Sequence, residues 1–296
     1  MTQPTTALSR ALALPIWSGT PTATALGGGI TNLNFLVTDA TRRAVVRIGD
    51  DIPVHQIMRF NELAASRAAH LAGVSPEVLY HEPGAMVIAH IDSHTMTAAD
   101  LCDDAMLDQA LDLLMRAHRE IPRHLRGPVV TFWVFHVLRD YAGTLRDWGS
   151  HHIPLIPRLL AEADRLQAAV GQIDMVFGHN DLLPANFLHD GSRMWLIDWD
   201  YGGFGSPLFD LGGLAANAGL SDAQERRVLA TYFARDVGGD LWRRYLAMKA
   251  AAALREAMWS MVQEIHSTLV FDYATYTATY LKTYRDALAA FEEFHD

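Results

Sequence analysis

The pattern of hydrophobic and polar positions changes about a third of the way along the chain. Two short runs rich in β-branched residues, Leu33–Val37 and Ala44–Ile48, are separated by a polar turn signal and predict a β-hairpin. Apolar residues at helical spacing between positions 54 and 72 predict a helix, and Gly73 gives it a C-terminal stop. The first part of the chain is therefore expected to be rich in strands, with one helix.

A second strand pair is expected at Val78–Tyr80 and Met86–Ile91, with a turn at Glu82-Pro83-Gly84 between them. From about Thr97 onward the apolar spacing is mostly helical. Further helices are predicted over residues 155–170, 221–235, 240–266 and 272–294.

One interruption divides this helical part. Apolar residues at Met175–Phe177, Phe187-Leu188 and Met194–Ile197 surround polar segments and predict short strands within the helical region. The pattern predicts an α+β protein with a small, β-rich lobe over residues 1–91 and a larger helical lobe over residues 92–296.

Composition and charge narrow the class of partner. The chain has 296 residues, of which 24 are basic and 34 acidic, for a net charge of -10. This balance argues against a nucleic-acid or anionic-membrane partner, which requires a basic face. No run approaches 18 apolar residues, and no signal peptide is evident, so we expect a cytoplasmic protein without membrane insertion. A monomer and a homodimer both remain open.

The strongest chemical signal lies in the interruption. Asp181 and Asn186 stand five residues apart in the segment His-Asn-Asp-Leu-Leu-Pro-Ala-Asn, and Asp198 follows an apolar strand. Phosphoryl transfer from ATP needs one carboxylate to orient the attacking hydroxyl and oxygen ligands to hold Mg²⁺. The spacing matches the catalytic loop of kinases, with Asp198 in the place of their metal-binding Asp. The alternative is a turn in which Asp and Asn cap local backbone.

A glycine-rich segment, Leu26–Phe35, lies between two expected strands. Its three consecutive glycines allow backbone N–H groups to approach phosphates closely. No Gly-Lys-Ser/Thr follows, and a strand rather than a helix comes next, so it is neither a Walker motif nor a Rossmann fingerprint. Taken alone, the segment is equally compatible with a flexible turn.

A charge pair is also expected. Kinases place a Lys on the strand after the glycine loop and pair it with a Glu on the following helix. Here the only lysines are Lys249 and Lys282, so Arg47 takes that place, and Glu62 is its candidate partner. Arginine suits this role because its fork can bind phosphate and carboxylate together. The alternative is a surface Arg and an unrelated Glu.

Taken together, these motifs resemble the choline/ethanolamine kinases, within the aminoglycoside-phosphotransferase-like group. The resemblance covers nearly the whole chain in order. It is carried by Gly28–Phe35, Val46-Arg47-Ile48, the loop with Asn180-Asp181 and Asn186, Leu196–Tyr201, Trp259–Gln263 and Phe271–Tyr276. It implies a two-lobed, protein-kinase-like fold with ATP and Mg²⁺ in the cleft between the lobes.

The resemblance also implies roles for individual residues. Asp181 would orient the substrate hydroxyl, Asn186 and Asp198 would bind Mg²⁺, and Asp200 would contact a second ion. Backbone groups at Ala89–Ile91 would hold adenine. The phosphates would be held by Gly28, Gly29, Thr31, Asn32, Asn34 and Arg47, with Arg47 fixed by Glu62.

The expected substrate is a small amino alcohol. A quaternary ammonium has no N–H group and is recognised by aromatic faces, each worth roughly 0.5–2 kcal/mol. Trp259 is the candidate face, with Tyr201 or Tyr273 as a second one and Gln263 as a further pocket residue, while Tyr276 and Tyr280 are expected in the core. The family often has a second Trp three residues before this one, where this chain has Glu256. A carboxylate there suits an ammonium with N–H groups better than trimethylammonium.

Three other readings remain. An aminoglycoside or another small alcohol would keep the same phosphotransfer residues and change only the pocket. A non-catalytic pseudokinase is disfavoured by the intact Asp181, Asn186 and Asp198, and a protein kinase by the missing Ala-Pro-Glu element. The 14 histidines form no His-Glu-x-x-His motif, and His179 is expected to be structural.

Overall fold

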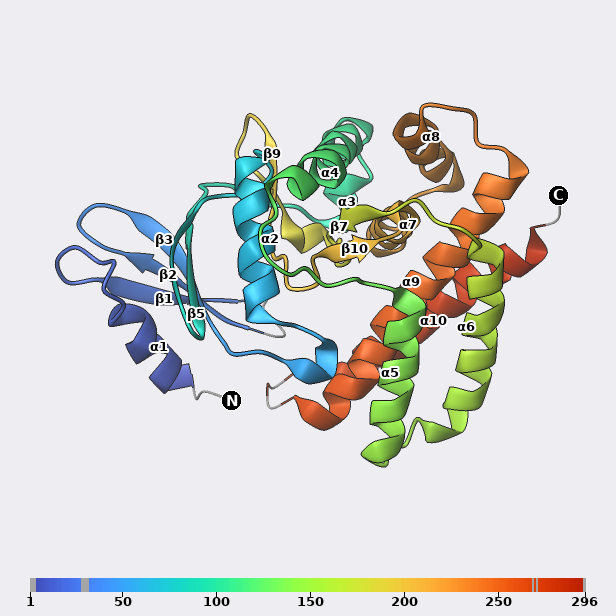
Figure 1. Ribbon diagram of the computed structural model, residues 1–296, viewed down its shortest axis with the longest axis horizontal. Helices are drawn as coiled ribbons and strands as arrows, with labels where there is room; N and C mark the ends of the chain where they lie inside the picture. Colours follow the sequence, from blue (N-terminus) through green and yellow to red (C-terminus); the bar gives the residue numbers. More distant parts are fainter. Residues whose placement is uncertain (1–3, 28–31, 268, 270, 295–296) are drawn as a thin grey trace.

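A five-stranded antiparallel sheet forms the first lobe, in the order β1-β2-β3-β5-β4. The computed structural model describes residues 4–27, 32–267, 269 and 271–294. The sheet lies at one end of the molecule and the helices fill the rest (Figure 1). Its strands are β1 (Thr22–Leu26), β2 (Leu33–Thr38), β3 (Arg43–Ile48), β4 (Val78–Glu82) and β5 (Ala85–Ala89).

Alternation along β3 gives the sheet two different faces. Val46 and Ile48 are buried in one apolar cluster with helix α1 (Pro4–Leu12), which covers that face. Successive strand residues point to opposite faces, so Arg47 points to the other face, toward the helical lobe. The register pairs Arg47 with Asn34 on β2 and Met86 on β5. One strand thus supplies both the lobe's core and a cation for the cleft.

Helix α2 (Arg59–Leu71) follows a short 3-10 turn, η1 (Pro53–His55), and connects the two lobes. Its buried alanines Ala65, Ala68 and Ala69 belong to the large apolar cluster of the helical lobe and not to the cluster between α1 and the sheet. In Figure 1 it stands between the sheet and α4 (Asp104–His124). The helix that carries Glu62 is therefore packed as part of the helical lobe.

The helical lobe is built around α9, whose side chains are buried along most of its length. Helices α5, α6, α7 and α10 all pack against it. No helix in the described ranges is both long and apolar enough to cross a membrane. The helices are α3 (Ala98–Leu101), α5 (Val134–Asp147), α6 (Ile156–Val170) after η2 (Ile153–Leu155), α7 (Pro207–Ala218), α8 (Asp222–Phe233), α9 (Gly239–His266) and α10 (Tyr273–Glu293).

Short strands hold the polar segments of this lobe. One small sheet has the order β6-β8-β9, and a second pairs β10 with β7. They bring the ends of segments 179–186 and 198–202 together. Their bounds are β6 (His94–Thr95), β7 (Val176–Gly178), η3 (Pro184–Asn186), β8 (Phe187–His189), β9 (Met194–Leu196) and β10 (Gly203–Gly205).

The strands and helices predicted from the hydrophobic pattern are present, with ends that differ by a few residues. The division at residue 91 remains a prediction. Helices α1, α5 and α7 were not expected. Helix α7 is buried along most of its length, so its sequence lacks the polar stripe that marks a surface helix. Gly212 lets α7 approach α9 closely, because a Cβ at this position would lie 2.8 Å from Lys249 Cα.

Candidate active site

The loop after β7 is held in place by Asp210 of α7. The carboxylate accepts backbone N–H bonds from His179 (2.8 Å) and Asn180 (2.7 Å), and its Oδ2 lies 2.9 Å from His118 Nε2. Asn180 has a left-handed backbone with φ of 63°. His179 is fully buried, and its Nε2 lies 2.9 Å from the Ile197 carbonyl oxygen, which is consistent with the structural role expected for it. These bonds fix the backbone of the loop immediately before Asp181.

Asp181, Asn186 and Asp198 are brought into one region. The Asn186 amide nitrogen Nδ2 donates to the Asp181 carbonyl oxygen at 2.8 Å. The backbone N–H of Ile197 donates to the Asn186 carbonyl at 3.0 Å, so Asp198 follows directly after this link. Asp198 has φ of 68°, a strained conformation for a non-glycine residue and one that recurs at functional sites.

The carboxylates of this region repel one another. Desolvation by the surrounding protein atoms raises the pKa of Asp198 well above its ordinary value, and the negative charges of Asp200 and Asp181 raise it further. The Asp198 side chain is nevertheless exposed. A divalent cation would relieve this repulsion. The Asn186 amide donates through nitrogen, which leaves its oxygen as a ligand, and Mg²⁺ prefers oxygen ligands. The residues present therefore fit a magnesium ion.

The predicted pair of Arg47 and Glu62 is formed. Arg47 Nη2 lies 2.7 Å from Glu62 Oε2, and both side chains are buried. Nε and Nη1 of Arg47 are also buried, and neither has a hydrogen-bond partner among the described residues. Buried donors are normally satisfied, so these two point to an acceptor that binds there. A phosphate has the oxygens that such donors need.

Arg59 of α2, which was not predicted from the sequence, links Glu62 to Asp200. Its Nη1 lies 2.8 Å from Glu62 Oε2 and 2.6 Å from Asp200 Oδ1, and its Nη2 donates to Asn32 Oδ1 at 2.6 Å. Asn32 Nδ2 completes the ring by donating to Asp200 Oδ2 at 2.8 Å. Both oxygens of Asp200 thus have protein partners, and contact between Asp200 and a second ion remains a prediction.

The structure describes only some of the other residues that were predicted to bind the nucleotide. Gly28, Gly29 and Thr31 lie outside the described residues. Asn34 lies opposite Arg47 in the sheet. At the predicted adenine position, the Ala89 N–H donates to the Glu77 carbonyl at 2.8 Å, and the Ile91 carbonyl accepts the Ser93 hydroxyl at 3.1 Å. Adenine binding at Ala89 and Ile91 remains a prediction.

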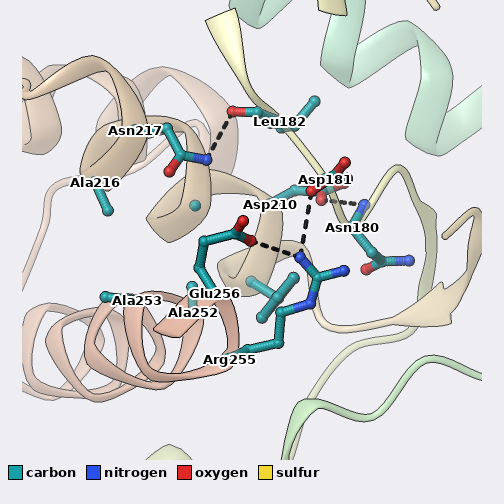
Figure 2. Close-up of a pocket in the computed structure, with 12 residues that line it drawn as sticks. Asn180, Asp181, Leu182, Asp210, Ala216, Asn217, Ala252, Ala253, Arg255 and Glu256 are labelled. Carbon is teal, nitrogen blue, oxygen red and sulfur yellow. Dashed lines mark hydrogen bonds and ion pairs between the residues drawn. The ribbon is translucent and has the colours of Figure 1, made fainter. Parts of the chain in front are cut away.

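A pocket opens beside Asp181, between the loop after β7, α7 and α9 (Figure 2). Its volume is about 330 Å³, part of it open to solvent. Charged and amide side chains face one another across it. The lining residues are Asn180, Asp181, Leu182, Phe209, Asp210, Gly213, Ala216, Asn217, Ala252, Ala253, Arg255 and Glu256.

Arg255 is the second residue that the sequence analysis missed. Its Nη1 lies 3.3 Å from Asp181 Oδ1 and 2.8 Å from Glu256 Oε2, so one nitrogen connects the two carboxylates (Figure 2). Its guanidinium carbon lies 4.1 Å from the ring centre of Tyr201. A charged pair in the otherwise apolar stretch from Ala250 to Trp259 was the available signal, because such charges are rarely buried without partners.

Glu256 faces the pocket with its charge already compensated. Besides the Arg255 contact, its Oε1 accepts the Tyr276 hydroxyl at 2.8 Å.

Burial raises the pKa of Asp181 to about 7, and the charge of Arg255 opposes this rise while that of Glu256 adds to it. The pocket therefore contains a carboxylate that changes its protonation state near neutral pH.

The other predicted substrate residues lie outside the lining of this pocket. Tyr201 is buried against Arg255. Trp259 is 3% exposed, and its ring centre lies 5.6 Å from that of His55, with Tyr273 and Tyr276 at 6.2 and 6.0 Å. Gln263 is buried one helical turn further along α9.

Tyr276 and Tyr280 were expected in the core, and this prediction was wrong in part. Both are partly exposed, and their ring centres lie 4.6 Å apart. The Tyr276 hydroxyl binds Glu256, and the Tyr280 hydroxyl donates to Asn217 at 3.2 Å. Both hydroxyls therefore contact residues that line the pocket, and the aromatic cluster around Trp259 adjoins the pocket through Tyr276.

Comparison with known proteins identifies relatives. The model of the phosphotransferase enzyme family matches residues 22–248. Protein LicA of Haemophilus influenzae is 28% identical over 217 residues, which cover 69% of this chain and 61% of LicA. Mouse ethanolamine kinase 2 is 28% identical over 193 residues, which cover 54% of this chain and 49% of that kinase. The matched regions thus span less than two thirds of both relatives.

The fold has close counterparts among solved structures. A choline/ethanolamine kinase family protein from Mesorhizobium loti superposes with a TM-score of 0.76 at 27% identity. The superposition covers 96% of this chain and 97% of that one. The expected two-lobed, kinase-like fold is confirmed.

Proposed function

The chain belongs to the phosphotransferase enzyme family, and from this premise we propose that it transfers the γ-phosphoryl group of ATP to the hydroxyl of a small amino alcohol. Choline, ethanolamine and methylated ethanolamines form the proposed substrate class. The observation that carries the proposal is Asp181, which lies in the wall of a small pocket beside Asn186 and is held by Arg255.

The nucleotide would lie under the sheet. Arg47, fixed by Glu62, offers two unpartnered donors on the cleft face, and Asn34 lies beside it. Asn186 and Asp198 would hold Mg²⁺, which when bound neutralises charge on the phosphates. The glycine segment before β2 would close over the phosphates with its backbone N–H groups.

Asp181 would act on the alcohol. As a carboxylate it accepts a hydrogen bond from the substrate hydroxyl, points the oxygen toward the γ-phosphorus and takes the proton as transfer proceeds. Arg255 holds this carboxylate in place and favours its ionised form. Among the carboxylates that line the pocket, only Asp181 belongs to the loop that bears Asn186.

The pocket favours a small cationic alcohol. Its space of about 330 Å³ includes part of the open solvent, so its enclosed part admits only a small ligand. The carboxylates of Asp181, Asp210 and Glu256 outnumber the single guanidinium among its charged lining residues. The ethanolamine kinase and choline/ethanolamine kinase family relatives support the same substrate class.

An ADP-release screen tests the proposal. Purified chain with Mg-ATP is supplied separately with choline, ethanolamine, its mono- and dimethyl forms, and several aminoglycosides, and Asp181→Asn serves as the blank. We expect turnover with at least one amino alcohol and none with aminoglycosides. Turnover only with aminoglycosides would show that the alternative substrate class is correct, and no turnover with any compound would indicate a pseudokinase.

A further inference from the structure

Two neighbouring histidines and one glutamate converge at the far end of α9. His152 Nε2 lies 3.1 Å from Glu264 Oε1 and 3.2 Å from Oε2. His151 Nε2 lies 3.6 Å from Glu264 Oε2, and the two imidazole ring centres are 3.8 Å apart. In the described part of the chain, this is the only group of three or more His, Cys, Asp or Glu side chains whose ligand atoms all lie within 4.8 Å of one another.

From this geometry we propose that His151, His152 and Glu264 form a binding site for a divalent transition-metal ion, with zinc as the best fit. Zn²⁺ is bound by His nitrogen at about 2.0–2.1 Å and by carboxylate oxygen at about 2.0–2.2 Å in a tetrahedron, which places ligand atoms about 3.3 Å apart. The distances from His152 Nε2 and His151 Nε2 to the Glu264 carboxylate oxygens, 3.1 to 3.6 Å, bracket that value. Two imidazoles and one carboxylate also leave the fourth position for water, a set known for zinc.

The three ligands stand on rigid supports. The histidines lie in the turn between α5 and η2, where the Ser150 N–H donates to the Leu145 carbonyl at 2.9 Å. The His152 N–H in turn donates to Ser150 Oγ at 3.2 Å. Both α5 and α6, which flank this turn, pack against α9, the helix that carries Glu264. The turn that bears the histidines and the helix that bears Glu264 are thus held next to each other before an ion binds.

A hydrogen bond to Glu264 and the exposure of the three ligands also fit a metal site. The Thr277 hydroxyl donates to Glu264 Oε1 at 2.6 Å, and such outer bonds orient metal ligands. The side chains of His152 and Glu264 are 12% and 13% exposed, whereas His151 is open to solvent. The site is therefore shielded on one side and open to an entering ion on the other. A bound ion would join the turn before α6 to α9 and, through Thr277, to α10.

The test uses metal-free, tag-free full-length chain titrated with ZnCl₂ by calorimetry and with CoCl₂ by visible absorption, which reports four-coordinate histidine ligation. Wild type is expected to bind one equivalent of Zn²⁺ in addition to any ion at the nucleotide site. We expect His152→Ala and the isosteric Glu264→Gln to lower that affinity roughly tenfold or more. His136→Ala removes an exposed histidine of α5 and is the matched control, which should bind like wild type.

Two further measurements separate this site from the nucleotide site and test binding to the folded state. An Asp198→Asn background separates this ion from one at the nucleotide site, so its zinc affinity at the histidines should be unchanged. Zinc should also raise the melting temperature of wild type and of His136→Ala, but not of His152→Ala, because the ion binds the folded state. The proposal is overturned if wild type binds no zinc, or if Glu264→Gln and His152→Ala bind it as wild type does. Neither readout depends on phosphotransfer, so the result is independent of the proposed function.

Discussion

Arg255 places Nη1 3.3 Å from Oδ1 of Asp181, although the two residues are 74 positions apart in the chain. The same nitrogen lies 2.8 Å from Glu256 Oε2. The proposed catalytic carboxylate therefore has one neighbour that stabilises its charge and another that opposes it. The balance between the two neighbours governs when Asp181 can accept a proton.

Substituting these two neighbours should move the pH profile in opposite directions. Only ionised Asp181 can accept the proton, and its pKa is raised to about 7, so activity should rise with pH through the neutral range. Glu256→Gln removes a charge that raises this pKa and should move the rise to lower pH, while Arg255→Met should move it to higher pH. The measurement is kcat/KM for the alcohol against pH at saturating Mg-ATP.

Arg255→Met leaves a buried carboxylate without its cation and can be unstable, so Glu256→Gln carries the prediction if that variant fails to fold. A profile that stays in place in Glu256→Gln would show that another group controls activity.

Asp181→Asn should abolish turnover without weakening nucleotide binding. The amide cannot take the proton, and loss of a general base typically costs roughly 10²–10⁴-fold in rate. Asp181 is proposed to contact the alcohol and not the phosphates, so the dissociation constant of Mg-ATP should stay within about twofold of wild type. Single-turnover kinetics and a nucleotide titration decide this together. An active variant would rule out the assigned role.

The same substitution should stabilise the fold at neutral and alkaline pH. The folded-state pKa of Asp181, about 7, lies above its ordinary value of 3.8, so the folded state binds the proton more tightly than the unfolded state does. Stability therefore falls as pH rises between these two values, and the loss is complete above about pH 7. Asn removes the charge. We expect a melting temperature higher by about 2–4 °C for each kcal/mol regained, and no gain at acidic pH.

Asp198→Asn should raise the Mg²⁺ concentration needed for half-maximal activity, roughly tenfold or more. The amide keeps the size of the side chain but loses the charge that attracts the ion. Magnesium titrations at fixed ATP measure the effect, and Asp147→Asn, an exposed aspartate at the end of α5, is the control. Identical activation curves for wild type and Asp198→Asn would mean that the ion binds elsewhere.

Arg47→Lys should lower kcat/KM for ATP roughly tenfold or more although the positive charge is kept. A lysine cannot hold Glu62 and also present two further donors in the same plane. Arg42→Lys, at the exposed end of the same hairpin, controls for the general effect of the exchange. If Arg47→Lys has wild-type kinetics, charge alone is sufficient at this position.

Glu256→Gln should also reduce discrimination between ethanolamine and choline. A carboxylate in the pocket wall gives charge-assisted hydrogen bonds to an ammonium that has N–H groups, which trimethylammonium cannot make. We expect wild type to use ethanolamine or a partly methylated ethanolamine at least as well as choline, and the variant to shift the ratio of kcat/KM values toward choline. The pH effect on Asp181 cancels in this ratio.

Tyr276→Phe is the matched control for that exchange, because it removes a hydrogen bond to Glu256 and leaves its charge in place. A wild type that strongly prefers choline, with a ratio unchanged by Glu256→Gln, would exclude Glu256 from substrate recognition.

The sequence was sufficient for features that depend on neighbouring residues. The segment from Asp181 to Asn186 is a local loop, and its spacing, together with Asp198 after an apolar strand, pointed to the chemistry. The pair of Arg47 and Glu62 was also predictable, because a strand followed by a helix places the two side chains in a known relation, and they lie 2.7 Å apart.

Contacts between distant segments could not be predicted in the same way. Arg59 meets Asp200 across 141 positions, and no local pattern connects them. The same holds for Arg255 and Asp181. The spacing of Glu256 and Trp259 suggested one shared pocket, yet residues three apart on a helix also differ in direction, and Trp259 packs instead against His55.

Helix α2 packs with the helical lobe, and this has a consequence for control of the enzyme. In kinases that are switched on and off, the helix carrying the Glu moves to make or break the pair with the strand cation. Here Ala65, Ala68 and Ala69 fasten that helix to the core, and Arg59 ties it to Asp200. The pair of Arg47 and Glu62 is therefore already formed in the unmodified chain. The output of the proposed phosphotransferase would then follow the supply of ATP and alcohol.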